Sequence, residues 1–274
     1  MLTDSLRAKQ QAVERQMAGC SRVLVAFSGG VDSTLLAVLA QRALGNDQVL
    51  AVTADSPSLA RADLAAATHT AAQLGLHHLV IQTHEVERPA YQANTPMRCY
   101  LCKHELFIEL EQLACQRQIP VILYGAIADD QPVERPGQQA AADHGVRAPL
   151  QEAGFTKQEI RQLARSLGLP NWDRPQNACL SSRLPHGQPV TREQLARIEQ
   201  AEAAVRAHGF RQVRVRARGH TASIEVGRDQ LEQLTDPAAG AAVMAAVQEC
   251  GFSTVTLDPL GYRSSGAASD ALTE

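Results

Sequence analysis

The sequence predicts an α/β fold with two parts: a parallel-sheet domain first, then a smaller α+β domain. Over the first two thirds of the chain, short apolar segments rich in Val, Leu and Ile alternate with helical segments. This alternation is typical of a parallel sheet that helices cover on both faces. Near residue 190 the pattern changes to a helix followed by short strands with mixed polarity. The change indicates a second domain of a different class.

The expected elements of the first domain follow one another in strict alternation. Helices are expected at residues 3–18, 34–44, 61–74, 103–118 and 156–168. Strands are expected at residues 22–27, 48–54, 77–82 and 121–124. Thr156 and Glu159 have the spacing of a capping box, which marks the start of the last helix. The segments 125–154 and 171–189 are rich in Gly, Pro and Asp and are expected to be irregular loops.

The second domain is expected to begin after residue 187, so that the domains cover residues 1–187 and 188–274. Its expected helices are 191–207 and 241–250, and its expected strands are 213–218, 222–226 and 253–257. The tail after about residue 264 consists of small and polar residues, and terminal segments of this kind are expected to be disordered.

Composition excludes several classes of protein. The chain has 274 residues, 45 % apolar and 20 % charged, with a formal net charge of −3. Without a basic excess, a large nucleic-acid footprint is not favoured. No apolar run approaches the roughly 20 residues that span a bilayer, and the N-terminus lacks the apolar core of a signal peptide. We therefore expect a cytoplasmic protein that is not associated with a membrane.

The segment Ser28-Gly-Gly-Val-Asp-Ser33 lies between an apolar strand and a helix and predicts a phosphate site. Gly29 and Gly30 allow the backbone to approach phosphate, and amide groups at a helix N-terminus point toward an anion. The hydroxyls of Ser28 and Ser33 add donors. Asp32 would repel phosphate and fits better as a partner of Mg²⁺. The plainer alternative is a glycine turn with a Ser/Asp helix cap.

Further site residues are expected where other strands end, because parallel sheets bind ligands beyond the carboxyl ends of their strands. Gly125 follows the strand 121–124 and is assigned to the nucleotide site. Asp129 is a second candidate for Mg²⁺, although Asp129 and Asp130 could equally shape a turn.

The chain has six cysteines, of which three lie in segments that suggest chemistry. Cys99-x-x-Cys102 precedes a predicted helix, and Cys179 lies in the loop Asn177–Arg183. Three thiolates are able to hold three irons of a [4Fe–4S] cluster and leave the fourth iron open. A structural zinc would require a fourth ligand, for which His104 and His186 stay open. The other cysteines, Cys20, Cys115 and Cys250, are expected to be small buried hydrophobic residues.

Three arginines alternate along the expected strand 213–218. A period of two places Arg214, Arg216 and Arg218 on one face, and guanidinium groups suit a substrate phosphate. The alternative is a solvated basic face. Glu199 and Glu202 on the preceding helix are weaker candidates for a polar or metal-linked role.

Together these segments resemble the LarE family of ATP-dependent sulfur transferases, within the PP-loop (adenine nucleotide alpha hydrolase-like) ATP pyrophosphatases. The resemblance spans roughly residues 10–265. The 178–183 and C-terminal segments are more specific than the PP-loop, which many enzymes share. The matching segments are 28–33, 98–103, 129–130, 135–137, 149–150, 156–157, 178–183, 257–258 and 261–263.

The resemblance implies an activity and a set of roles. ATP would adenylate one carboxylate of pyridinium-3,5-biscarboxylic acid mononucleotide, and sulfur would then displace AMP to give a thiocarboxylate during nickel-pincer nucleotide biosynthesis. The adenine would lie near Thr53, and Arg214 and Arg216 would bind the substrate phosphate. The sulfur would come from a [4Fe–4S] cluster on Cys99, Cys102 and Cys179, or from Cys179 itself, which becomes dehydroalanine. The family also implies a homo-oligomer and transient contacts with other nickel-pincer biosynthesis proteins.

Three alternative functions stay open at this point. A PP-loop tRNA thiolase would share ATP and the cysteines but needs a basic surface for the phosphate backbone. An amide-forming PP-loop ligase would not need Cys179. A non-catalytic nucleotide-binding regulator would bind ATP without releasing pyrophosphate.

Overall fold

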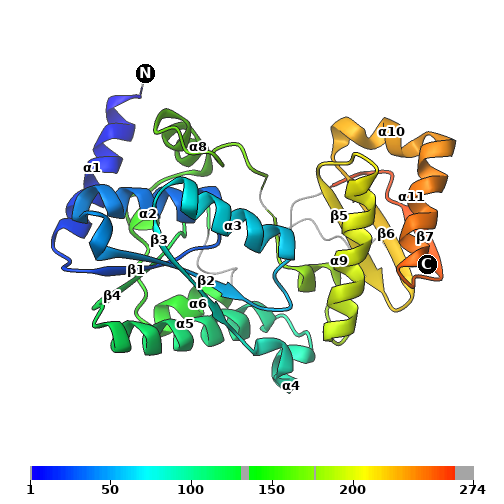
Figure 1. The fold of residues 1–274 in the computed structure, drawn as a ribbon, viewed down its shortest axis with the longest axis horizontal. Helices are drawn as coiled ribbons and strands as arrows, with labels where there is room; N and C mark the ends of the chain where they lie inside the picture. Colours follow the sequence, from blue (N-terminus) through cyan, green and yellow to red (C-terminus); the bar gives the residue numbers. More distant parts are fainter. Residues whose placement is uncertain (1, 131–135, 176, 263–274) are drawn as a thin grey trace. The chain divides into compact units, whose positions relative to one another are not determined.

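The structure is a computed structural model that describes residues 2–130, 136–175 and 177–262 (Figure 1). It divides into two compact units. The first comprises residues 1–88 and 96–176, and the second comprises residues 89–95 and 177–274. The tail expected after residue 264 lies outside the described residues, as do Arg135 and Arg263 of the family segments. No helix within the described ranges is long and apolar enough to cross a membrane.

The first unit contains a four-stranded, entirely parallel sheet, which confirms the predicted fold class. Its strands are β1 (Val23–Ala26), β2 (Val49–Asp55), β3 (His77–Gln82) and β4 (Val121–Tyr124), in the spatial order β3-β2-β1-β4. Strands β2 and β3 lie on one side of β1, and β4 lies on its other side. This reversal of strand order lies at β1, and ligands bind beyond the carboxyl end of such a strand.

Helices cover both faces of this sheet (Figure 1). Along β1, Val23 and Val25 belong to the core cluster shared with α1, α2, α3 and α8, and Leu24 belongs to the cluster on the other face with α5 and α6. The first unit's helices are α1 (Asp4–Ala18), α2 (Val31–Leu44), α3 (Arg61–Gln73), α5 (Arg98–Arg117), α6 (Pro136–Asp143), α7 (Pro149–Glu152) and α8 (Lys157–Ser166), with short 3₁₀ turns η1 (Asn46–Gln48) and η2 (Glu85–Glu87). Because both faces of β1 are covered, Val23, Leu24 and Val25 are all buried, which explains why its sequence is a continuous apolar run.

Two expectations about the first unit need correction. The segment 125–154 is not irregular throughout, because it contains α6 and α7. Ala140 and Ala141 of α6 are buried in the cluster with α5, so burial of small side chains favours a helix despite the nearby Pro and Gly. In addition, α5 begins at Arg98 and not near residue 103. Cys99 and Cys102 therefore lie inside its first turns.

The second unit is a smaller α+β fold, as predicted. Its sheet has the order β5-β6-β7, in which β5 and β6 are antiparallel and β6 and β7 are parallel. Its strands are β5 (Val213–Arg218), β6 (Thr221–Val226) and β7 (Thr254–Leu257). Its helices are α4 (Pro89–Gln92), α9 (Arg192–Ala207), α10 (Leu231–Thr235) and α11 (Pro237–Glu249), with 3₁₀ turns η4 (Leu180–Arg183) and η5 (Arg228–Gln230).

The second unit starts earlier than the expected residue 188 and includes a segment from the middle of the first. Asn94 explains this, because its buried side-chain amide donates hydrogen bonds to the carbonyl oxygens of Pro185 (2.7 Å) and Gln188 (2.8 Å). The backbone amide of Val190 also donates to the carbonyl oxygen of Gln92. Cys179 consequently belongs to the second unit, whereas Cys99 and Cys102 belong to the first.

Replacement of Asn94 should destabilise the second unit. Asn94→Ala removes both amide donors and places alanine at a left-handed φ of 52°, where asparagine is tolerated better. We expect a loss of about 3 kcal/mol in the free energy of unfolding, measured by urea denaturation. His186→Ala, an exposed position in the same loop, is the control and should leave the midpoint unchanged. Equal stability of both variants would contradict the role given to Asn94.

Candidate active site

The loop between β1 and α2 is closed by its own hydrogen bonds. The Ser33 hydroxyl donates to the Gly30 carbonyl oxygen (3.1 Å) and accepts from the Ser28 amide (3.2 Å). The Ser28 hydroxyl accepts from the Gly30 amide (3.3 Å) and contacts the Ser33 hydroxyl at 3.1 Å. The predicted phosphate loop is thus held in one shape at the start of a helix. Such a preformed loop costs little ordering entropy on binding.

Two glycines of the predicted site are required by close packing. Gly29 has a φ of +69°, and a Cβ there would lie 2.6 Å from the Cβ of Ala67 on α3. Gly125 follows β4, and a Cβ there would lie 2.9 Å from the Ser33 amide nitrogen. The structure therefore brings Gly125 directly against the loop, as the strand-end argument expected. In both places a larger side chain would displace backbone.

Asn171 contacts the loop from a distant part of the sequence, which sequence reasoning missed. Its buried side-chain amide donates to the Gly29 carbonyl oxygen (2.9 Å) and to the Thr34 hydroxyl (2.9 Å). These bonds fix the loop to the first turn of α2. Asn171 lies in a segment with no repeat or motif, so only the tertiary structure identifies it.

Both aspartates assigned to Mg²⁺ contact Lys157 at the start of α8. The Lys157 ammonium group lies 2.6 and 2.9 Å from the two carboxylate oxygens of Asp32. Asp129 accepts a hydrogen bond from the Lys157 backbone amide at 2.7 Å. Burial raises the pKa of Asp32, and the charge of Lys157 opposes this shift. The Mg²⁺ role of these aspartates stays a prediction, and in this structure they organise Lys157.

The Thr53 side chain forms its hydrogen bonds within the sheet. Its buried hydroxyl donates to the Phe27 carbonyl oxygen (2.6 Å) and is 2.8 Å from Nε2 of His78 on β3. Burial lowers the pKa of His78. Because the hydroxyl already has two hydrogen-bond partners, we expect any hydrogen bond to adenine at this position to come from the backbone of β2. The role of Thr53 in adenine binding stays a prediction.

The cysteines assigned to a cluster are divided between the units. Cys99 is exposed and Cys102 partly buried, one helical turn apart in α5. Cys179 is partly buried and directly precedes η4 in the second unit. All six cysteines are described, and none forms a disulfide. The described residues contain no group of three or more His, Cys, Asp or Glu side chains placed to bind a metal ion.

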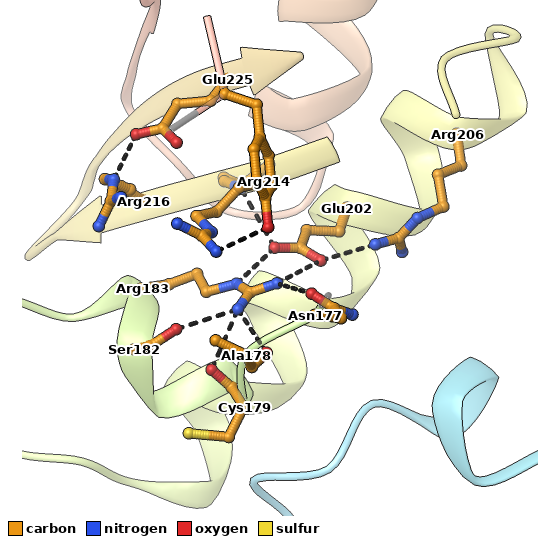
Figure 2. Close-up of polar contacts among 12 residues, drawn as sticks. Asn177, Ala178, Cys179, Ser182, Arg183, Glu202, Arg206, Arg214, Arg216 and Glu225 are labelled. Atoms are coloured by element: carbon orange, nitrogen blue, oxygen red, sulfur yellow. Dashed lines mark hydrogen bonds and ion pairs between the residues drawn. The ribbon is translucent and has the colours of Figure 1, made fainter. Parts of the chain in front are cut away.

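The Cys179 segment is held by a buried arginine (Figure 2). The Arg183 guanidinium donates to the carbonyl oxygens of Ala178 (2.6 Å) and Cys179 (3.1 Å) and to the side-chain oxygen of Asn177 (3.0 Å). It also forms an ion pair with Glu202 on α9 at 2.7 Å. Burial lowers the pKa of Arg183, but the carboxylate of Glu202 outweighs it and the net shift is upward. Glu202 thereby fixes the backbone at Cys179.

The arginines assigned to substrate phosphate lie on β5 near this ion pair (Figure 2). Arg214 is buried, its guanidinium lies 4.5 Å from the ring centre of Tyr262, and it donates to the Tyr262 hydroxyl at 2.9 Å. Arg216 forms an ion pair with the buried Glu225 on β6. Burial is the main cause that lowers the pKa of Arg214. Their role in binding phosphate stays a prediction, since each side chain already has a partner.

Glu202→Gln should remove the ion pair between Arg183 and α9. The side chains of Arg183 and Glu202 are at most 1 % exposed, and removing one charge of such a pair leaves the other without compensation. We expect a loss of about 3 kcal/mol in the free energy of unfolding, measured by urea denaturation. Gln200→Ala, exposed on the same helix, should be neutral. A Glu202→Gln protein as stable as wild type would refute this assignment.

Comparison with known proteins agrees with the loop and the fold. Residues 3–106 match the NAD synthase family model. The chain is 41 % identical over 259 residues to a protein of unassigned function from Synechocystis sp., which covers 94 % of this chain and 96 % of that protein. A shorter match is the argininosuccinate synthase of Halobacterium salinarum, which is 32 % identical over 161 residues, or 54 % of this chain and 40 % of that enzyme.

A further relative matches both units. The pyridinium-3,5-bisthiocarboxylic acid mononucleotide synthase of Lactiplantibacillus plantarum is 34 % identical over 270 residues, 98 % of this chain and 97 % of that enzyme. The match therefore includes the phosphate loop, the Cys179 segment and the second sheet. The chain belongs to the LarE family of PP-loop enzymes, which use ATP to transfer sulfur.

Proposed function

We propose that this enzyme adenylates a carboxylate of pyridinium-3,5-biscarboxylic acid mononucleotide and converts it to a thiocarboxylate during nickel-pincer nucleotide biosynthesis. The observation that supports this most is that one chain has both a preformed phosphate loop and, in its second unit, a cysteine segment fixed by Arg183 and Glu202. The bisthiocarboxylic product in the name of the L. plantarum relative supplies the substrate class.

The first step uses the loop 28–33. A carboxylate oxygen of the substrate attacks the α-phosphorus of ATP, and the bond from that phosphorus to the β-phosphate bridging oxygen breaks. Pyrophosphate leaves with the electron pair, and an acyl adenylate remains. The assigned nucleotide contacts are Ser28, Gly29, Gly30, Asp32, Ser33, Thr53 and Gly125, with Mg²⁺ on Asp32 and Asp129. A carboxylate is a poor electrophile, and adenylation supplies its leaving group.

The second step uses Cys179. In one route its thiolate attacks the acyl adenylate and releases AMP. Loss of the cysteine Cα proton then forms the Cα=Cβ bond of dehydroalanine, and the Cβ–S bond breaks with its electron pair on the departing thiocarboxylate. In the other route, which we favour, Cys99, Cys102 and Cys179 would hold a [4Fe–4S] cluster, and the cluster would supply a reactive sulfide when bound. This route is supported by the chemistry of the donors: all three thiols are outside disulfides, and Cys99 and Cys102 are one helical turn apart. The described residues do not bring three such ligands together.

The second unit has a binding role in this proposal. Arg214 and Arg216 would bind the substrate phosphate and would give up their contacts with Tyr262 and Glu225 to do so. This unit, expected as residues 188–274, would also contribute to a homo-oligomer. Transient contact with other nickel-pincer biosynthesis proteins would pass the product on.

Cys179→Ala should separate the two steps. The variant should still form pyrophosphate, because ATP cleavage does not involve the thiol, but it should form no thiocarboxylate. Pyrophosphate assay and mass spectrometry of the mononucleotide check both products, with Cys115→Ala, an exposed cysteine, as the control. Full turnover by Cys179→Ala would favour an amide-forming ligase. Salt-dependent tRNA binding would favour a tRNA thiolase, and ATP binding without pyrophosphate release would favour a regulator.

The source of sulfur can be tested by anaerobic purification. We expect about four irons per chain and a brown protein, and we expect Cys99→Ala to lose both while the Cys115→Ala control keeps them. Mass spectrometry after turnover should show Cys179 unchanged. An iron-free protein that loses the mass of one H₂S at Cys179 would show that the cysteine is sacrificed instead.

A further inference from the structure

The ion pair of Arg183 and Glu202 holds only the backbone at Cys179. The dashed lines in Figure 2 join the guanidinium to the carbonyl oxygens of Ala178 and Cys179, and none reaches the thiol. Directly after the cysteine the chain forms the 3₁₀ turn η4, in which the Ser182 amide donates to the Cys179 carbonyl oxygen at 3.0 Å. A short 3₁₀ turn has poorer hydrogen-bond geometry than an α-helix. The direction of the turn, and of the thiol at its start, therefore depends on contacts from another segment.

We propose that Tyr91 of α4 is a positioning residue for the Cys179 thiol and that it acts through Ser181. This inference rests on the proposed function and deepens it, because it concerns how ATP cleavage stays coupled to sulfur transfer. It gives the segment 89–95, which contains none of the catalytic or binding residues assigned above, a part in the second step of the reaction.

The Tyr91 and Ser181 side chains meet inside the second unit. Their hydroxyl oxygens are 2.8 Å apart, so that one donates a hydrogen bond to the other. Tyr91 is 1 % exposed and Ser181 is 0 % exposed. Loss of such a bond is costly, because bulk water cannot replace the missing partner. Ser181 lies in η4, two residues after Cys179, so the bond fixes the turn that begins at the cysteine.

Tyr91 is presented to the turn by a segment that has its own anchors. The Gly187 amide donates to the Asn94 carbonyl oxygen (3.0 Å), and the Val190 amide donates to that of Gln92 (2.9 Å). These backbone bonds add to the two side-chain bonds of Asn94 described above. The segment is thus attached to the loop that follows η4, and the position of the Tyr91 hydroxyl does not depend on η4 itself.

The position of the thiol decides whether the acyl adenylate reacts with sulfur or with water. A displacement of about 1 Å in a reacting group is able to lower a rate about a hundredfold. When attack by sulfur is slow, a water oxygen bonds to the acyl carbon instead, AMP leaves with the electron pair of its bond, and the water protons pass to the solvent. The original carboxylate is restored. ATP is then consumed without formation of a thiocarboxylate.

The first test measures this coupling in Tyr91→Phe, which keeps the buried ring and removes the hydroxyl. Pyrophosphate and thiocarboxylate are quantified in the same reaction. We expect thiocarboxylate formation to fall about fivefold to tenfold, as for one lost buried hydrogen bond, and pyrophosphate formation to stay within about twofold of the wild type. Ser181→Ala should show the same change. Ser253→Ala is the matched control, because its exposed hydroxyl bonds the His220 carbonyl oxygen in the same unit, and it should behave as the wild type does.

Hydrogen exchange of the peptide 178–184 tests the contact without substrate. The Ser182 and Leu184 amides donate the hydrogen bonds within η4, so their exchange reports opening of the turn. We expect Tyr91→Phe and Ser181→Ala each to speed this exchange about fivefold, and the double variant to be no faster than the faster single variant, because both changes remove the same bond. Multiplied effects in the double variant, or unchanged exchange in both single variants, would overturn the proposal.

The two measurements distinguish this proposal from the proposed function. If the wild type forms no thiocarboxylate, the proposed function fails, while the exchange data still decide whether Tyr91 holds η4. Faster exchange with unchanged coupling in Tyr91→Phe would mean a purely structural role and would overturn the positioning role. Urea midpoints identify a variant that does not fold, and the other single variant then decides. Loss of the fold in both Tyr91→Phe and Ser181→Ala would also overturn the proposal, because the pair would then serve folding and not the position of the thiol.

Discussion

The closed loop at the end of β1 is the constraint on which the first unit depends. Hydrogen bonds between Ser28, Gly30 and Ser33 fix its shape, but they do not fix its position. Position comes from three other parts of the chain: Ala67 packs against Gly29, Gly125 packs against Ser33, and Asn171 holds the Gly29 carbonyl. The parallel sheet and its helices serve to bring these segments to one place.

A corresponding constraint organises the second unit. Arg183 and Glu202 form a buried ion pair whose remaining donors satisfy backbone oxygens around Cys179. A buried pair of this kind contributes little net stability, because desolvation offsets the attraction. Its value here is geometric. The guanidinium fork fixes a short irregular segment that has no strand or long helix to hold it, and so gives one cysteine a defined environment.

The sequence allowed most of the fold to be predicted, because periodicity and turn residues report local structure directly. Strand 49–55 and the helix after Thr156 illustrate this, since a Val-rich run and a capping box define them. Partners distant in sequence were not predictable in this way. Nothing in the segment around Asn171 indicates a contact with Gly29, and nothing near Asn94 indicates its bonds to Pro185. Such contacts depend on tertiary packing, as does the assignment of 89–95 to the second unit.

The same reasoning explains why the aspartates were easier to find than their partner. Asp32 lies in the segment that predicted a phosphate site and Asp129 lies beyond the end of a predicted strand, whereas Lys157 follows an ordinary helix cap. An aspartate inside a phosphate loop is unfavourable unless a cation accompanies it, and the sequence offers none within the loop. The fold supplies one from α8, held by Asp129 at its backbone and by Asp32 at its side chain. Charge balance at the loop thus requires two segments far apart in sequence, and the docking of α8 against the loop provides the second one.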